Sequence, residues 1–238
     1  MILRSLILLW VSLSFSGLSG AAAPDDQPLF NGKDFSGWKQ PHGTWRTVES
    51  VWLKKDQPTE LAAKEGKGVM VNSEAGRTVD LLTEANHGDC QLFVEFMVPQ
   101  GSNSGVYLQG RYEVQILDSF GKDKVSYSDC GGLYEGVDNG KGFPGRAPSV
   151  NASRAPGEWQ SFEIHFRAPR FDSTGRKTEN ARFIKVVHNG KLIHENIEVT
   201  GPTRSAAFAD EKPEGPLKLQ GDHGPVAFRN LTLKPLEK

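Results

Sequence analysis

Residues 103–118 constrain the fold most strongly, because two kinds of side chain alternate along them. An apolar set consists of Val106, Leu108, Tyr112, Val114 and Ile116, and a more polar set consists of Tyr107, Gln109, Arg111, Glu113 and Gln115. A period of two is typical of β-strands, and Gly110 divides the stretch into two of them. The pattern predicts an antiparallel hairpin that buries Val106, Leu108, Val114 and Ile116 between sheets and presents the polar set on an open, concave face.

The polar set is unusual for a solvated strand face, which more often carries Lys, Thr and Ser. Planar amide, guanidinium and carboxylate groups beside an aromatic ring suit the hydroxyls and the apolar ring face of a sugar. We therefore interpret this face as a candidate carbohydrate-binding surface. The alternative is that Arg111 and Glu113 form a surface ion pair that only solvates the strand, a contact worth less than about 1 kcal/mol.

Further short strands, separated by turn residues, follow along the rest of the chain. We expect them at residues 45–53, 68–72, 79–83, 91–98, 159–167, 182–188 and 191–194, and again near the C-terminus. Asn189-Gly190 is a strong hairpin signal. The break in alternation between Phe228 and Leu231 predicts a bulge near Arg229.

Glycine is abundant, at 26 of 238 residues, and long helical periodicity is absent, as in a loop-rich β protein. Polar loops are expected at 170–180 and at 119–156, where the second loop is the candidate rim of a binding cleft. Roughly a dozen short strands predict an all-β fold, a two-sheet antiparallel jelly-roll sandwich. The length suits a single domain, which we place at residues 24–238.

The first 23 residues have the character of a secretory signal peptide. Arg4 supplies a short positive region, residues 6–13 form an apolar run too short to cross a bilayer, and small residues lead to cleavage after Ala22 or Ala23. The sequence predicts an exported, soluble protein, periplasmic or extracellular, without a membrane span. The formal net charge of −1 argues against a nucleic-acid partner.

Cys90 and Cys130 are the two cysteines of the chain. Export makes a disulfide between them reasonable, and we predict that they are bridged. The bridge would close a loop of about 40 residues, worth about 4 kcal/mol in the chain-entropy model. Two free, buried thiols are the alternative, because the sequence does not give the distance between them.

Four motifs together resemble a known family. They are the stretch 103–118, Leu-Phe-Asn-Gly-Lys-Asp-Phe-Ser-Gly-Trp at 29–38, Pro-Gly-Glu-Trp at 156–159 and Leu-Gln-Gly-Asp-His-Gly-Pro-Val-Ala-Phe-Arg-Asn at 219–230. In this order they resemble the 3-keto-disaccharide hydrolase-like domain, over essentially the whole mature chain. The resemblance implies a concanavalin A-like lectin/glucanase sandwich, exported by a bacterium, that acts on glycosides oxidised at C3 by elimination and hydration.

Such chemistry needs a base near C2, a group that stabilises charge at the C3 oxygen and a proton donor for the leaving group. Glu113 is the first candidate for the base, because it stands in the middle of the polar face. His223 is the second, because imidazole ordinarily titrates near neutrality and the Gly-Asp-His-Gly context predicts an exposed turn. The alternative is a purely structural role, in which Asp222 and His223 only form that turn.

Further residues are candidates for substrate contacts. Arg111, Gln115 and Arg229 can donate hydrogen bonds to an enolate or to hydroxyls, and Tyr107 or Tyr134 can stack on a sugar ring. The predicted set of substrate-binding residues is Tyr107, Gln109, Arg111, Gln115, Asp118, Tyr134, Gln220 and Arg229. Asp118 can also act as a structural acceptor for the loop that follows it.

The sequence assigns no cofactor, although a divalent metal ion is compatible with it. Its Asp, Glu and His residues show no zinc-type spacing, and its carboxylates do not define a calcium site. Glu113 also has no acidic partner on its own strand face, which argues against the two-carboxylate hydrolysis of ordinary glycosidases. A non-catalytic, lectin-like carbohydrate-binding module and an exported scaffold are the alternative functions, and no pattern bears on the oligomeric state.

Overall fold

The computed structural model describes residues 27–73, 76–138 and 140–236, and the predicted signal peptide at 1–23 lies outside them. The described residues contain no helix long and apolar enough to cross a membrane. They form sixteen strands: β1 (Gln27–Pro28), β2 (Arg46–Lys54), β3 (Gln57–Val71), β4 (Leu81–His87), β5 (Cys90–Met97), β6 (Asn103–Leu108), β7 (Tyr112–Leu117), β8 (Gly136–Asp138), β9 (Lys141–Phe143), β10 (Gln160–Arg167), β11 (Arg170–Phe171), β12 (Lys177–Glu179), β13 (Ala181–His188), β14 (Lys191–Val199), β15 (Gly215–Leu219) and β16 (Ala227–Pro235).

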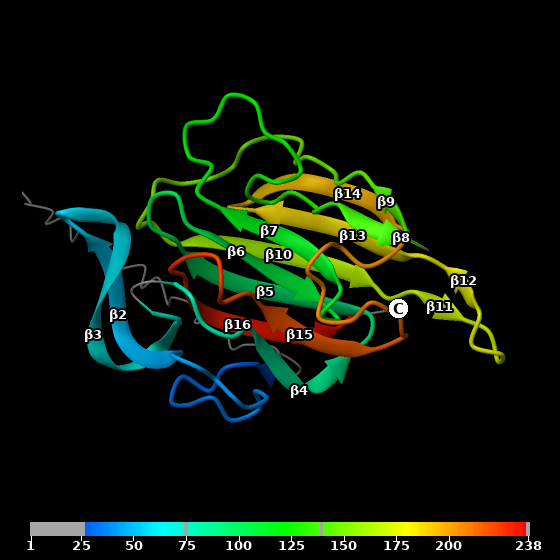
Figure 1. The fold of residues 1–238 in the computed structure, drawn as a ribbon, viewed down its shortest axis with the longest axis horizontal. Helices are drawn as coiled ribbons and strands as arrows, with labels where there is room; N and C mark the ends of the chain where they lie inside the picture. Colours follow the sequence, from blue (N-terminus) through cyan, green and yellow to red (C-terminus); the bar gives the residue numbers. More distant parts are fainter. Residues whose placement is uncertain (1–26, 74–75, 139, 237–238) are drawn as a thin grey trace, which may run out of the picture.

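Two large sheets dominate the structure (Figure 1). An eight-stranded sheet has the order β14-β13-β10-β5-β16-β3-β2, with β1 also paired to β16, and a four-stranded sheet has the order β4-β15-β6-β7. Two short hairpins, β8–β9 and β11–β12, complete the arrangement. All strand pairs are antiparallel, which confirms the prediction of an all-β fold.

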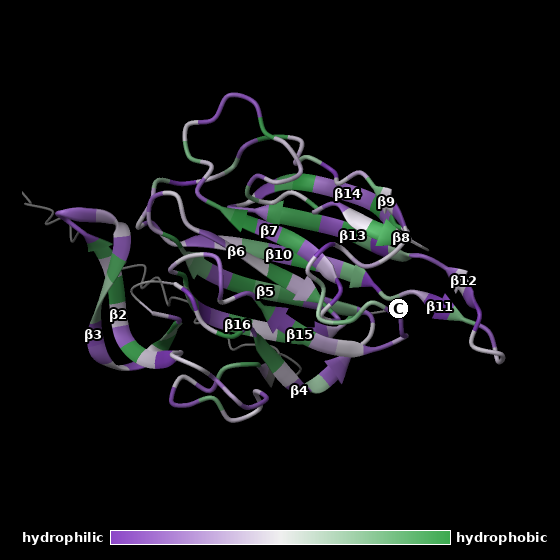
Figure 2. Cartoon of the chain, in the orientation of Figure 1, coloured by the Kyte–Doolittle hydropathy of each residue, from purple (hydrophilic) through white to green (hydrophobic). Residues whose placement is uncertain are grey.

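The main hydrophobic core joins the two large sheets. Phe96, Phe162 and Phe166 of the larger sheet belong to one cluster with Val106 and Val114 of the smaller one. Figure 2 shows hydrophobic residues along the central strands and hydrophilic ones in the connecting loops. The four residues predicted to be buried by alternation are fully buried, which confirms the register of the central hairpin: Val106, Leu108, Val114 and Ile116.

The three local backbone predictions are confirmed. The β6–β7 turn has positive φ at Gln109 (54°) and Gly110 (66°), which suits the right-handed twist of a hairpin. The β13–β14 turn likewise has positive φ at Asn189 and Gly190. In β16 the register shifts between Arg229 and Thr232, as a bulge requires.

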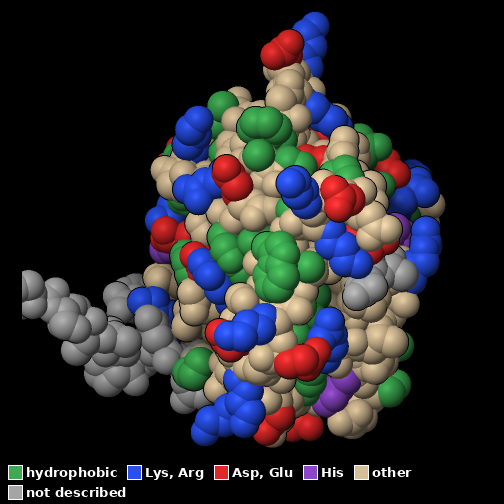
Figure 3. Space-filling view, turned by 90° about the vertical axis from the view of Figure 1, so that its left-hand side faces the viewer, with side chains coloured by type: hydrophobic (Ala, Val, Ile, Leu, Met, Phe, Trp, Pro, Cys, Tyr) green, Lys and Arg blue, Asp and Glu red, His purple; other side chains and the backbone are tan. Residues whose placement is uncertain are grey.

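The structure has more strand than the sequence pattern predicted. The strand expected at 68–72 is the end of β3, which begins at Gln57 and pairs with β2 in a ribbon at one end of the larger sheet (Figure 1). The middle of β3 is exposed and polar, with an ion pair of 2.7 Å between Lys64 and Glu49, so it lacks apolar alternation. Charges of both signs surround apolar side chains at this end of the molecule (Figure 3). The loops expected at 119–156 and 170–180 also contain the two short hairpins.

The predicted disulfide is absent, because Cys90 and Cys130 are both free and buried. Cys90 pairs with Phe166 on β10, whereas the Cys130 Sγ lies 4.0 Å from Nε2 of His188, whose backbone partner on β10 is Phe162. Four residues of strand, roughly 13 Å, separate these two positions. The two cysteines therefore lie against different parts of β10, whereas a disulfide requires Cα atoms within about 7 Å of each other.

We expect neither cysteine to react with iodoacetamide in the native protein at neutral pH. Burial raises the pKa of each thiol to about 12, and the thiolate is the reactive form. After unfolding in guanidinium chloride without a reductant, both should be alkylated, which intact-protein mass measures directly. An unfolded chain that remains unalkylated would show that the two cysteines form a disulfide after all.

Candidate functional site

The outer face of the four-stranded sheet collects polar side chains from strands that are distant in sequence. Tyr107 on β6 lies opposite Lys218 on β15 and opposite Glu113 on β7. Beyond β7, the residues around Leu133 continue the ladder, because Leu133 bridges Val114 and the Tyr134 N–H donates to the Glu113 carbonyl over 3.4 Å. Opposite residues project from the same face of a sheet. One row therefore holds Lys218, Tyr107, Glu113 and Tyr134, with Glu113 between the two tyrosines.

A neighbouring row runs parallel to the first. Gly105 lies opposite Gln115, and its carbonyl accepts a hydrogen bond of 3.0 Å from the Gln220 N–H. A Cβ at Gly105 would come within 2.3 Å of the Glu113 Oε1 and 2.9 Å of the Tyr107 ring. The absence of a side chain at this position is what leaves room for the Glu113 carboxyl group over the sheet. The row thus places the Gln115 amide on one side of the Glu113 carboxyl group and the Gln220 amide on the other.

Glu113 is 3% exposed, and its electrostatic environment is unusual. Burial raises its pKa to about 8, whereas the hydrogen bond from Tyr107 and the charge of Lys218 lower it, and the charge of Asp80 raises it further. Burial dominates because the low-dielectric surroundings disfavour a carboxylate. The carboxyl group is therefore mostly protonated at pH 7 and can give up its proton slightly above that pH.

Lys218 is a buried cation that the sequence analysis missed. Its ammonium group lies 2.8 Å from an Asp80 carboxylate oxygen, 2.8 Å from the Ser205 carbonyl and 3.8 Å from the centre of the Tyr107 ring. The alternation of Leu217 and Leu219 around it is the signal that could have placed it on the outer face. Lys218 fixes the Tyr107 ring beside Glu113 and holds Asp80 at the edge of the site.

His223 stands at the exposed side of the site. Its Nδ1 lies 2.5 Å from an Asp222 carboxylate oxygen and 3.2 Å from the Gln220 Nε2. A carboxylate only accepts hydrogen bonds, so Nδ1 carries the proton and donates it to Asp222. In the neutral ring Nε2 then keeps its lone pair, on a side chain that is 51% exposed. A substrate can reach this nitrogen from solvent.

Two of the three buried amide oxygens that lack partners among the described residues belong to the second row. They are the Oε1 atoms of Gln115 and Gln220, on side chains that are 3% and 5% exposed. A buried acceptor without a hydrogen bond is costly, and ligand hydroxyl groups can satisfy it. The second row therefore offers two acceptors to a polyhydroxylated ligand beside the Glu113 carboxyl group.

The sequence profile of the 3-keto-alpha-glucoside-1,2-lyase-like domain matches residues 25–234. The chain belongs to this family. A comparison with curated proteins gives no match.

Solved structures of Parabacteroides distasonis proteins resemble this family member. A candidate glycosyl hydrolase is 28% identical, with a TM-score of 0.65 over 90% of this chain and 84% of that one. Another is 20% identical, with a TM-score of 0.59 over 89% and 99% of the two chains, and shows likeness of fold alone. The family and the 28% identical neighbour indicate a carbohydrate-active protein of the glycoside-cleaving type.

The structure of this lyase-like domain brings together six of the ten predicted site residues. These are Tyr107, Glu113, Gln115, Tyr134, Gln220 and His223. Their face is enclosed rather than open, since Tyr107, Glu113 and Gln115 are at most 3% exposed. The alternation correctly separated the two faces of the hairpin, but the loops that cover its outer face come from distant parts of the chain. The predicted loop rim contributes Tyr134 directly beside β7.

Gln109 and Arg111 lie at the far end of the hairpin and hold the segment before β15. The Gln109 Nε2 donates to the Pro213 carbonyl over 2.9 Å, and the Arg111 Nη2 lies 2.7 Å from an Asp210 carboxylate oxygen. The Arg111 guanidinium also stacks 4.7 Å from the centre of the Phe208 ring. Arg111 and the Nε2 of Gln109 are thus engaged in structural contacts within the domain, whereas the buried Gln109 Oε1 has no partner among the described residues.

Asp118 and Arg229 are also distant from Glu113. Asp118 accepts hydrogen bonds from the backbone N–H groups of Gly101 and Phe120, which is the structural role considered for it. Arg229 lies on β16 of the larger sheet, 2.7 Å from a Glu95 carboxylate oxygen and over the ring of Trp159. Within the described ranges of the domain, no group of three or more His, Cys, Asp or Glu side chains is arranged to hold a metal ion.

Proposed function

We propose that this protein cleaves the glycosidic bond of 3-keto-glycosides, such as 3-keto-disaccharides, on a jelly roll of the concanavalin A-like type. The observation that carries the proposal is the buried Glu113 carboxyl group, with a pKa of about 8, in a polar site that also contains the Asp222-held imidazole of His223. Titratable groups with strongly shifted pKa values in a polar, enclosed site are typical of catalysis. The family membership of the chain supports the same substrate class.

The ketone explains why such a bond can be broken by proton transfer. A carbonyl at C3 acidifies the proton on C2, and the glycosidic oxygen on C1 is then β to the resulting carbanion and can leave. One group must remove the C2 proton, and another must protonate the departing oxygen. The site supplies two suitable groups of different character.

We assign the base to His223 and the acid to Glu113, which reverses the order that the sequence favoured. The Nε2 of His223 has a free lone pair, because Nδ1 donates to Asp222. The Glu113 carboxyl group is protonated below about pH 8, so at neutral pH it is a donor rather than an acceptor. Gln115 and Gln220 are placed to bind hydroxyl groups or the C3 oxygen, and Tyr134 is placed to contact the ring.

Over the two steps of the reaction, His223 and Glu113 return to their starting protonation states. In the elimination, His223 takes the C2 proton, the C1–O bond breaks and Glu113 protonates the leaving alcohol. In the hydration, water adds to C1 of the unsaturated ketone and gives a proton to the Glu113 carboxylate, while the imidazolium returns its proton to C2. The products are a 3-keto sugar and the free alcohol, with no oxidant or reductant consumed.

The test is to incubate the purified protein with a 3-keto-disaccharide and with its unoxidised parent, with and without a chelator and with added divalent metals. We expect cleavage of the ketone and none of the parent, whose C2 proton is not acidic. Product sugars are measured by chromatography. Equal cleavage of both substrates would indicate ordinary hydrolysis, and binding without turnover under every metal condition would favour the lectin-like module.

A further inference from the structure

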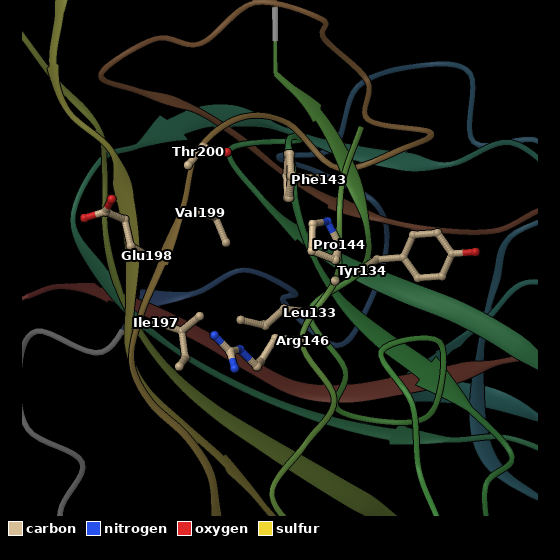
Figure 4. A pocket seen from close by; sticks show the side chains of 10 residues that line it. Leu133, Tyr134, Phe143, Pro144, Arg146, Ile197, Glu198, Val199 and Thr200 are labelled. Carbon is tan, nitrogen blue, oxygen red and sulfur yellow. The ribbon is translucent and has the colours of Figure 1, made fainter. Parts of the chain in front are cut away.

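A hollow of about 340 Å³ lies between the end of β14 in the larger sheet and the segment 133–146, which continues the smaller sheet beyond β7 (Figure 4). One wall comes from the end of β14, with Ile197 and Val199, and the other from the chain around Leu133, Phe143 and Arg146. The volume falls in the range of small-molecule sites, about 300–1,000 Å³. Its lining is largely apolar, with polar side chains from Tyr134, Arg146, Glu198 and Thr200.

The register of the sheet extension turns Arg146 toward this hollow. Leu133 is bridged to Val114 on one side and to Arg146 on the other. Val114 and Leu133 belong to the core, and directly opposite residues share a face, so the Arg146 side chain leaves the backbone on the core side. Figure 4 shows its guanidinium in the hollow near Ile197, whereas the Tyr134 side chain points away.

The guanidinium of Arg146 has no hydrogen-bond or ion-pair partner among the described residues. Glu198 also lines the hollow, but its carboxylate binds Asn180 over 2.9 Å and Arg182 over 2.6 Å, and Figure 4 shows it directed away. Burial and the charge of Arg146 together lower the pKa of His194 to about 4, so this histidine is neutral near pH 7. The hollow therefore combines largely apolar walls with one exposed guanidinium that has no protein partner among the described residues.

We propose that this hollow binds an organic monocarboxylate with an apolar body about the size of one aromatic ring. Arg146 binds the carboxylate, and Leu133, Ile197 and Val199 contact the body. A guanidinium presents two parallel N–H groups that match a carboxylate, and the exposed Arg146 side chain leaves them accessible to a ligand, whose apolar body can pack on the neighbouring apolar side chains.

This site is separate from the Glu113 site. The two lie on opposite faces of the same ladder, which the hydrogen bond from the Tyr134 N–H to the Glu113 carbonyl continues. The backbone of the ladder therefore lies between a ligand in the hollow and the Glu113 carboxyl group. The inference is independent of the glycosidase proposal, and a binding measurement alone tests it.

The experiment is a calorimetric titration of the purified protein with trans-cinnamate and, as an uncharged match, with cinnamamide. We expect saturable binding of cinnamate to one site, and binding of cinnamamide that is weaker by at least about tenfold, because the amide lacks the charge. Arg146→Gln should weaken cinnamate binding by a similar factor. Arg176→Gln, at a guanidinium-bearing side chain that is 81% exposed in the β11–β12 hairpin, is the matched control and should leave it unchanged.

A second variant tests the apolar wall. Ile197→Trp adds a bulky ring at the wall of the hollow and should also weaken cinnamate binding, while Glu113→Gln should leave it unchanged because that side chain faces the other site. The proposal is overturned by an absence of saturable cinnamate binding to the wild-type protein. It is equally overturned if Arg146→Gln binds cinnamate normally, if cinnamamide binds as tightly, or if Glu113→Gln abolishes binding.

Discussion

Replacement of Glu113 by Gln is expected to slow turnover of a 3-keto-disaccharide by about a hundredfold to ten-thousandfold. The amide keeps the size of the carboxyl group over Gly105 and can still hydrogen-bond to Tyr107, but it has no acidic proton for the leaving oxygen. Substrate affinity should change little, since the shape of the site is kept. Initial rates at saturating substrate and a separate binding titration distinguish these effects.

Substrates with different leaving groups distinguish the two roles that Glu113 could have, acid for the leaving oxygen or base at C2. A 4-nitrophenyl 3-keto-glycoside releases a stabilised phenolate that needs little protonation, so Glu113→Gln should lose far less activity on it than on the disaccharide. Equal losses on both substrates would instead make Glu113 the base at C2. Glu84→Gln, at an exposed position of β4, is the matched control and should behave as the wild type. Wild-type rates for Glu113→Gln on both substrates would place the active site elsewhere.

The same assignment fixes the direction of the pH dependence. Burial raises the pKa of Glu113 to about 8, so the carboxyl group holds its proton below that pH and loses it above. An acid acts only in its protonated form, so kcat/KM on the disaccharide should fall as the pH rises through about 8. A base at this position would produce a rise over the same interval. The two assignments therefore predict opposite limbs of the profile.

Alternation predicted the fold well where one strand face is apolar. It placed the buried side chains of β6 and β7, and the turn chemistry of Asn189-Gly190 and the bulge near Arg229 followed from local signals. These features depend on neighbours in sequence, which a single chain reveals. The long ribbon of β2 and β3 was underestimated because its polar middle is stabilised by pairing and surface ion pairs, neither of which leaves an apolar period.

The site was harder to predict, because it depends on contacts between distant strands. Lys218 joins Tyr107 only through the pairing of β15 with β6, and Tyr134 joins Glu113 only because the chain returns beside β7. Arg229 has the parity of a polar residue, but the sequence does not reveal that β16 belongs to the other sheet. The predicted disulfide is wrong for the same reason, since it was inferred from the predicted export alone, and the sequence does not show which strands the two cysteines pack against.

Replacement of His223 by Ala is expected to cost about a hundredfold to ten-thousandfold in turnover on the disaccharide and on the 4-nitrophenyl substrate alike. Removal of the C2 proton precedes departure of either leaving group, so an activated aglycone cannot compensate for the missing base. Asp222→Asn should have a smaller effect, because it weakens only the hydrogen bond that holds the imidazole with Nε2 free. A loss confined to the disaccharide would contradict the assignment of His223 as base.

Chemical rescue provides the sharpest check on His223, because its side chain is about half exposed. Added imidazole should restore part of the activity of His223→Ala by entering the vacated space and taking the C2 proton in place of the side chain. Deuterium at C2 should slow the wild-type reaction and the rescued reaction, since both break that C–H bond. Acetate should not rescue Glu113→Gln, because the space beside Gly105 is buried and filled by the amide. Rescue of neither variant, together with no effect of C2 deuterium, would rule out proton abstraction at C2 as the slow step.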